Sequence, residues 1–228
     1  MMYSVLLSKI EFGFPFVEEK LKKIVKSGMK VTVMPWAFPT ELDYEKLNNE
    51  YFKVGEKKYN KYIKPLIKLG IKKEDITILN CYDNNNIYTF KNIINSSDIL
   101  LLPGGNPEMF FNKVVHATEL LYEIKHFNGI IIGESAGACL QFERYFITAK
   151  NNFYKYFAFY DGFGILNDPF YIDVHSSNNH KYIESLKKIS NKTKKDIYAI
   201  YNDGAILYNR KNKKIDIYGN VLKIPYAE

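Results

Sequence analysis

The sequence predicts an α/β fold, in which a largely parallel β-sheet is flanked by helices and followed by a short antiparallel C-terminal meander. Short β-branched and apolar runs alternate with longer segments whose apolar residues recur at helical spacing, which is typical of a parallel sheet. The composition, with 46% hydrophobic and 25% charged residues, is that of an ordinary globular protein. A chain of 228 residues can bury a full core and no linker pattern interrupts it, so we expect one domain over residues 1–228.

The expected strands are apolar runs that end in turns or lead into helices. They are Tyr3–Leu7, Lys30–Met34, Ile76–Leu79, Asp98–Leu102, Gly129–Ile132, Tyr171–His175 and Asp196–Ile200. The expected helices lie between these strands. They are Phe16–Lys26, Leu42–Leu69 with a break at Gly55 or Pro65, Ile87–Ile94, Pro107–Phe127 and Asn178–Ile189. In an open sheet of this kind ligands bind at the carboxyl ends of the strands, so the loops there are the places to look for a site.

The C-terminal segment has a different pattern, because polar turns separate short strands with no helix between them. The strands expected there are Ala205–Tyr208, Lys214–Tyr218 and Val221–Ile224. This arrangement predicts the antiparallel meander that ends the fold.

Charge and cysteine usage exclude several classes of protein. The net charge of +7 comes from 32 basic residues that are nearly all lysines spread over helix faces and turns, so we expect no nucleic-acid partner. The apolar runs are far shorter than the roughly 20 residues of a membrane span, so we expect a soluble protein with no membrane partner. Cys81 and Cys139 form no CxxC pair, which favours reduced thiols and a cytoplasmic location.

The segment Gly133-Glu-Ser-Ala-Gly137 carries the clearest chemical signal. It follows an apolar strand directly, and the small residues after it are compatible with a helix. A G-x-S-x-G sequence in this context predicts a nucleophile elbow, a tight strand-to-helix turn that exposes a serine. Ser135 is therefore the candidate nucleophile, and the amide of Ala136 can face an oxyanion.

A second glycine-rich turn, Pro103-Gly-Gly-Asn106, ends the preceding strand. Paired glycines at a strand end can present a backbone N–H to a neighbouring site, as the second donor of an oxyanion hole must. Pro-Gly-Gly-Asn is also an ordinary turn sequence, so its value comes from its place beside the elbow strand.

A serine nucleophile needs a base, and the strand-end His175 is the candidate, with His180 as the alternative. His116 and His126 lie in an expected helix, where an exposed surface position is typical. The third member of a triad is a carboxylate that orients the imidazole. Asp203 follows the next strand.

Three other carboxylates remain open alternatives to Asp203 in that role. They are Asp173, Asp161 and Glu143. Asn-Asp-Gly is also strong turn chemistry, so Asp203 has a purely structural interpretation as well.

These motifs together resemble the aspartyl dipeptidase (peptidase E) and cyanophycinase family of serine peptidases. The segments that carry the resemblance are Pro103–Asn106, Gly133–Ala138, Gly162–Leu166, His175 and Asn202–Gly204. The resemblance implies a class I glutamine amidotransferase-like fold, which is a flavodoxin-like three-layer arrangement. It also implies Ser135 as nucleophile, His175 as base, Asp203 as acid, and Gly105 and Ala136 as oxyanion-hole residues.

The sequence departs from the family pattern at two positions. Glu134 precedes the serine where an aromatic or small residue is expected, and a carboxylate there disfavours build-up of negative charge. Asp203 is one methylene shorter than the family's glutamate. Glu134, Asn106 and Arg144 are candidate substrate-binding residues, and Arg144 is a candidate anchor for an acidic substrate.

We therefore expect a serine peptidase that cleaves a small peptide, with an acidic N-terminal residue as one candidate specificity and an acyl-enzyme as intermediate. The competing hypothesis is a catalytically impaired, amidotransferase-like binding protein. No cofactor and no metal are expected, because Asp173, His175 and His180 lack a recognised metal-ligand spacing. The aromatic segment 153–171 has three interpretations, namely satellite core, a lid over the substrate, or the face of a homodimer.

Overall fold

The computed structural model describes residues 2–38, 50–81, 87–149, 154–167 and 170–227. Its central sheet has the strand order β10-β9-β1-β5-β4-β2-β3, and β8 pairs with β9 beside this path. The strands are β1 (Tyr3–Leu7), β2 (Val31–Val33), β3 (Ile76–Ile78), β4 (Ile99–Leu102), β5 (Ile130–Glu134), β8 (Phe170–Val174), β9 (Asp196–Asn209) and β10 (Lys214–Ile224). The mostly parallel sheet and the antiparallel C-terminal meander confirm the predicted fold class.

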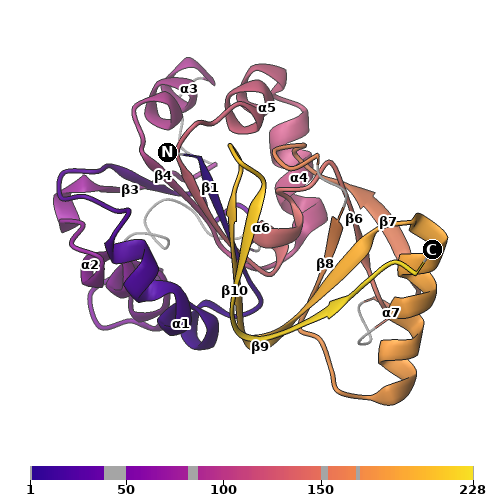
Figure 1. Cartoon of the computed structure of the whole chain (residues 1–228). Helices are drawn as coiled ribbons and strands as arrows, with labels where there is room; N and C mark the ends of the chain where they lie inside the picture. Colours follow the sequence, from indigo (N-terminus) through magenta and orange to yellow (C-terminus); the bar gives the residue numbers. More distant parts are fainter. Residues whose placement is uncertain (1, 39–49, 82–86, 150–153, 168–169, 228) are drawn as a thin grey trace.

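The carboxyl ends of the parallel strands lie together along one side of the sheet. β1, β5, β4, β2 and β3 are parallel, whereas β9 runs antiparallel to β1 and β10 antiparallel to β9. Figure 1 shows β1 and β4 in the middle of the molecule, with helices on both sides of them. The helices are α1 (Ile10–Lys22), α2 (Lys64–Lys68), α3 (Ile87–Asn95), α4 (Pro107–Val115), α5 (Thr118–Lys125), α6 (Ala136–Cys139) and α7 (His180–Thr193).

The period-2 alternation of the strands builds one apolar core on each face of the sheet. Leu6, Leu100 and Ile131 pack with the α3–α6 layer, whereas their strand neighbours Val5 and Leu101 pack with α1 and α2. Both faces of β1, β4 and β5 are buried, so the sequence shows continuous apolar runs here rather than alternation. A third, smaller cluster lies under α7 and joins β8, β9 and β10 through Leu186.

The C-terminal strands are longer than expected. β9 is continuous through Asn202–Gly204, where the sequence predicts a turn, and β10 continues past Gly219 through an irregularity in register. The ladder between β9 and β10 explains both differences, because each strand supplies hydrogen-bond partners across the other's turn-like residues. In Figure 1 the two strands form one long ribbon that reaches from the central sheet toward α7.

Three other elements differ from the sequence prediction. Helix α1 begins at Ile10, with Pro15 inside it, rather than at Phe16. The helix expected over Pro107–Phe127 is divided between α4 and α5. The helix expected over Leu42–Leu69 lies partly outside the described residues, and the described part contains a π-helical turn, Tyr59–Ile63, before α2.

A hairpin that the sequence analysis did not predict joins β6 (Arg144–Ile147), which precedes the aromatic segment, to β7 (Ala158–Asp161) within it. Phe159 packs against Phe146 and Tyr171, and the buried Phe163 contacts Phe110 edge-on. These contacts favour the satellite-core interpretation for Phe159 and Phe163, whereas Tyr156 and Phe157 are exposed.

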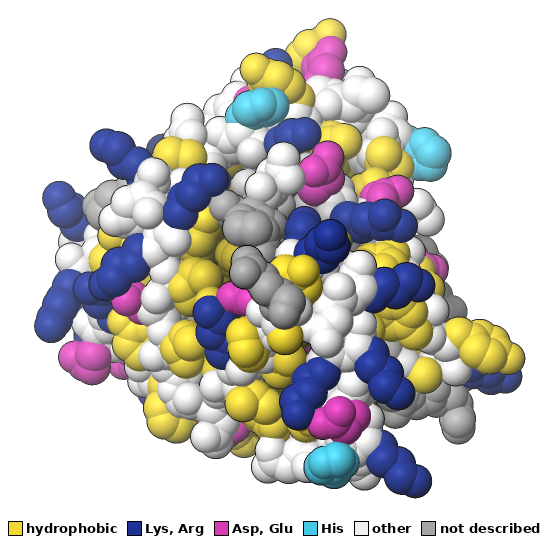
Figure 2. Space-filling view, turned by 45° about the vertical axis from the view of Figure 1, so that its right-hand side comes forward, with side chains coloured by type: hydrophobic (Ala, Val, Ile, Leu, Met, Phe, Trp, Pro, Cys, Tyr) yellow, Lys and Arg dark blue, Asp and Glu magenta, His cyan; other side chains and the backbone are white. Residues whose placement is uncertain are grey.

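The basic side chains are spread over the surface of the molecule, as the sequence predicts. Figure 2 shows Lys and Arg side chains scattered over the visible face, with acidic and hydrophobic side chains between them. Within the described part of the chain, none of the helices combines the length and apolar character that crossing a bilayer requires.

The close contact between α6 and β4 leads to a test. A Cβ at Gly137 would lie 2.0 Å from the carbonyl oxygen of Leu102, which is backbone and cannot move aside locally. We expect Gly137→Ala to lower the free energy of unfolding by about 3 kcal/mol or more, at the upper end for overpacking. Gly70→Ala is the matched control, because nothing lies within 4 Å of its Cβ position and only its positive φ of 91° opposes alanine. Its expected cost is about 1 kcal/mol, and equal losses in denaturant unfolding would contradict this account.

Candidate active site

Ser135 occupies a sharp turn between β5 and α6. Its backbone has φ 49° and ψ −107°, a region that non-glycine residues rarely adopt. The Ser135 N–H donates to the Leu7 carbonyl at 2.8 Å, which fixes the turn to the end of β1. A Cβ at Gly133 would lie 2.3 Å from the Gly137 carbonyl oxygen, so the glycines allow the strand and helix to approach this closely.

His175 follows β8 and faces Ser135. Its Nε2 lies 2.8 Å from Ser135 Oγ, and its own φ of 56° is also in the left-handed region. Ser8 holds this turn, because its hydroxyl donates to the Ile200 carbonyl and accepts from the His175 N–H. The structure therefore brings together two of the residues that the sequence singled out, and both have strained backbones.

Asn202, not Asp203, lies against the far side of the imidazole. His175 Nδ1 is 3.1 Å from Asn202 Oδ1, whereas the Asp203 carboxylate accepts from Asn220 Nδ2 at 2.5 Å. The two residues are adjacent on β9, so their side chains point to opposite faces. An amide oxygen only accepts, so Nδ1 carries the ring proton and Nε2 is left to accept from the Ser135 hydroxyl.

The other acidic alternatives lie in different surroundings. The buried Asp173 carboxylate accepts hydrogen bonds from the hydroxyls of Ser176 and Tyr182. Asp161 is exposed on β7, opposite Arg144 in the hairpin register, and Glu143 is exposed in the turn before β6. His180 begins helix α7 at an exposed position.

The glycine-rich turn after β4 flanks the elbow as expected. Gly105 has φ 151°, and a Cβ there would lie 2.3 Å from the Ala37 carbonyl oxygen. Gly105 and Ala136 both line the cavity at Ser135, as expected for residues near an oxyanion. Asn106 caps α4, since its side-chain oxygen accepts from the Met109 N–H.

The cavity at Ser135 has a volume of about 220 Å³. Its described lining combines apolar side chains of β6 with the polar groups Thr148, Tyr154, Asp173 and His175. A second hollow of about 770 Å³ shares His175 and continues past Lys181 at the start of α7. Neither Glu134 nor Arg144 is among the described lining residues, and Arg144 instead lies over the ring of Phe159 at 4.7 Å.

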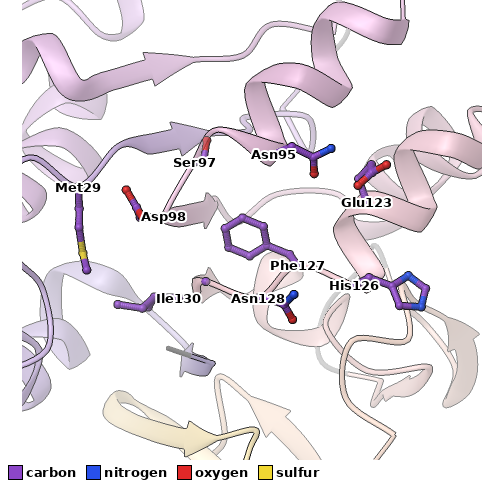
Figure 3. Close-up of a pocket in the computed structure, with 10 residues that line it drawn as sticks. Met29, Asn95, Ser97, Asp98, Glu123, His126, Phe127, Asn128 and Ile130 are labelled. Carbon is purple, nitrogen blue, oxygen red and sulfur yellow. The ribbon is translucent and has the colours of Figure 1, made fainter.

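A further cavity, of about 590 Å³, lies at the opposite edge of the sheet (Figure 3). Asp98 and Ile130 line it, and these residues stand at the amino ends of β4 and β5, far from the elbow. Its Asp98 carboxylate accepts from the Lys30 N–H. This cavity therefore does not belong to the candidate active site. The described residues contain no group of three or more His, Cys, Asp or Glu side chains placed to hold a metal ion.

Comparison with known proteins identifies the family of this chain. The profile of peptidase family S51 matches residues 17–216. The chain belongs to peptidase family S51. It is thus a serine peptidase, and the resemblance to the peptidase E family is confirmed.

Two solved structures share the fold of this S51 peptidase. One is a protein from Listeria monocytogenes EGD-e, provisionally named as a peptidase E. It has a TM-score of 0.64 and 22% identity over 95% of this chain and 98% of that chain. The other is a peptidase from an acI-B1 actinobacterium, with a TM-score of 0.65 and 17% identity over 100% of this chain and 96% of that chain. A search of curated proteins finds no match.

Two residues of the site escaped the sequence analysis, Asn202 and Ser8. Asn202 immediately precedes the predicted Asp203. Only the register of β9 decides which of the two side chains points toward His175. Ser8 follows a strand end, where a polar residue is common, so no local signal marks it.

Adjacent substitutions on β9 test the part played by Asn202 in this S51 peptidase. We expect Asn202→Ala to slow labelling by a fluorophosphonate at least about 10-fold, because the imidazole loses the group that orients it. Asp203→Ala is the matched control and should stay within about 2-fold of wild type. If Asp203→Ala slowed labelling more than Asn202→Ala, the group that orients the imidazole would be Asp203.

Proposed function

We propose that this peptidase hydrolyses the amide bond of short peptides through an acyl-enzyme on Ser135. The observation that carries the proposal is the 2.8 Å contact between Ser135 Oγ and His175 Nε2, in a turn that faces a small cavity. Asn202 takes the place of the expected Asp203 as the group that holds the imidazole.

The proposed reaction uses the groups already described. His175 Nε2 removes the hydroxyl proton as Oγ forms a bond to the substrate carbonyl carbon. The oxyanion then develops near the backbone amides of Gly105 and Ala136. His175 returns the proton to the leaving amine as the C–N bond breaks, and a water molecule, activated in the same way, hydrolyses the ester.

The charge of the cavity bears on the substrate. Among its described lining residues, Asp173 is the one Asp, Glu, Lys or Arg side chain. The negative charge of this carboxylate attracts the α-ammonium group of a short peptide, and it repels an acidic side chain of the substrate. We therefore propose free-amino dipeptides with neutral N-terminal residues as substrates, in preference to N-terminal aspartate.

The nucleophile can be tested directly. A fluorophosphonate probe is expected to label wild type and not Ser135→Ala, because phosphonylation requires the activated hydroxyl. Intact mass and circular dichroism establish the site of labelling and that the variant is folded. A folded wild-type protein that resists the probe would favour the alternative, an amidotransferase-like binding protein.

A dipeptide panel tests the specificity. We expect Ala-Xaa dipeptides to be cleaved at least about 10-fold more efficiently than Asp-Xaa or N-acetylated Ala-Xaa, measured as kcat/KM. Asp173→Asn should reduce the difference between free and acetylated substrates. Faster cleavage of Asp-Xaa by wild type would contradict the role assigned to Asp173.

A further inference from the structure

Glu134 is a buried carboxylate that the proposed reaction does not use. It immediately precedes the nucleophile, yet only 3% of its surface is exposed. As the last residue of β5, it points to the opposite side of the strand from Ser135. Its carboxylate therefore faces α1 and the π-helical turn, whereas the Ser135 hydroxyl faces His175.

Groups from three separate segments donate to this carboxylate. Oε1 accepts from the Ile10 N–H at 3.0 Å and lies 2.8 Å from Lys61 Nζ. Oε2 accepts from the Tyr62 hydroxyl at 2.5 Å and from the Gly104 N–H at 3.2 Å. A buried carboxylate is costly without such partners, and here the N-terminus of α1 adds favourable potential.

The two side chains that donate to Glu134 keep their protons at neutral pH. Burial by itself lowers the pKa of Lys61, but its hydrogen bond to Glu134 and the negative charge there raise that pKa above the ordinary value. Burial and the charge of Glu134 raise the pKa of Tyr62, so its hydroxyl remains a donor. The carboxylate thus keeps the same donors across neutral pH.

One of these donors belongs to the turn beside the nucleophile. A Cβ at Gly104 would lie 3.0 Å from Glu134 Oε2 and 3.2 Å from Ser135 Cβ, so this residue packs on the elbow itself. The next residue, Gly105, lines the cavity, and the Asn106 N–H donates to the Ala37 carbonyl. Glu134 holds one end of the turn, and the Ala37 contact holds the other.

We propose that Glu134 is a positioning residue: it ties the Gly104–Gly105 turn to the nucleophile elbow, so that the Gly105 amide faces the oxyanion formed at Ser135. The inference rests on the proposed peptidase function. The proposal also explains why a carboxylate can stand next to the nucleophile. Glu134 lies on the far side of β5 and acts through its hydrogen bond to the backbone N–H of Gly104.

Glu134→Gln tests the proposal with little change in size. Of the four donors, only the Tyr62 hydroxyl can also accept, so the new NH₂ group is expected to turn toward Tyr62. Gly104 N–H lies on that side and would then face another donor. We expect kinact for fluorophosphonate labelling to fall about 10- to 100-fold, as when an oxyanion donor is displaced, whereas KI changes less than about 3-fold.

Glu11→Gln is the matched control. Glu11 also pairs with Lys61, at 3.1 Å, but makes no contact with the glycine turn, so labelling should stay within about 2-fold of wild type. Tyr62→Phe removes one donor from Oε2 and decides the question if Glu134→Gln does not fold. We expect it to lower kinact about 2- to 10-fold.

The outcomes separate this inference from the proposed function. If wild type is labelled at Ser135 and a folded Glu134→Gln is labelled with wild-type kinact, Glu134 has only a structural role and the inference is overturned. The same holds for an unchanged kinact in Tyr62→Phe where Glu134→Gln fails to fold. If wild type itself is not labelled, the proposed peptidase activity fails first.

Discussion

The close packing of β1, β5 and β4 at their carboxyl ends is the constraint on which the site depends. The chain must pass from β5 into α6 where the carbonyl oxygens of Leu102 and Gly137 leave no space for a Cβ at the flanking glycines. The hydrogen bond from Ser135 to Leu7 closes this turn. These contacts hold the backbone of Ser135 in its unusual conformation, because the paired strands β1, β5 and β4 fix one side of the turn and α6 fixes the other.

This turn separates two environments within two residues. Ser135 faces a cavity and an imidazole, whereas Glu134 faces the start of α1, the π-helical turn and Gly104. The Glu134 carboxylate is buried on the second side, where a lysine and backbone amides offset its charge. The first side holds the Ser135 hydroxyl, the His175 imidazole and the Asp173 carboxylate that lines the cavity.

The residues that contact His175 come from parts of the chain that only the sheet brings together. Ser8, which follows β1, bridges the carbonyl of Ile200 in β9 and the backbone N–H of His175. Asn202 completes the contact from the same strand. The position of His175 therefore depends on the pairing of β9 with both β1 and β8, rather than on the local sequence around His175.

The sequence by itself determined the features that arise from local backbone requirements. These are the alternation that predicts the sheet, the glycine-flanked Ser135, the turn at Gly105 and the strand-end His175. Tertiary structure decided the rest, because it depends on contacts between distant segments. The capping of Ile10 by Glu134 starts α1 before Pro15. The register of β9 places Asn202 rather than Asp203 against the imidazole, since neighbouring residues of a strand face opposite sides and one step along the chain exchanges them.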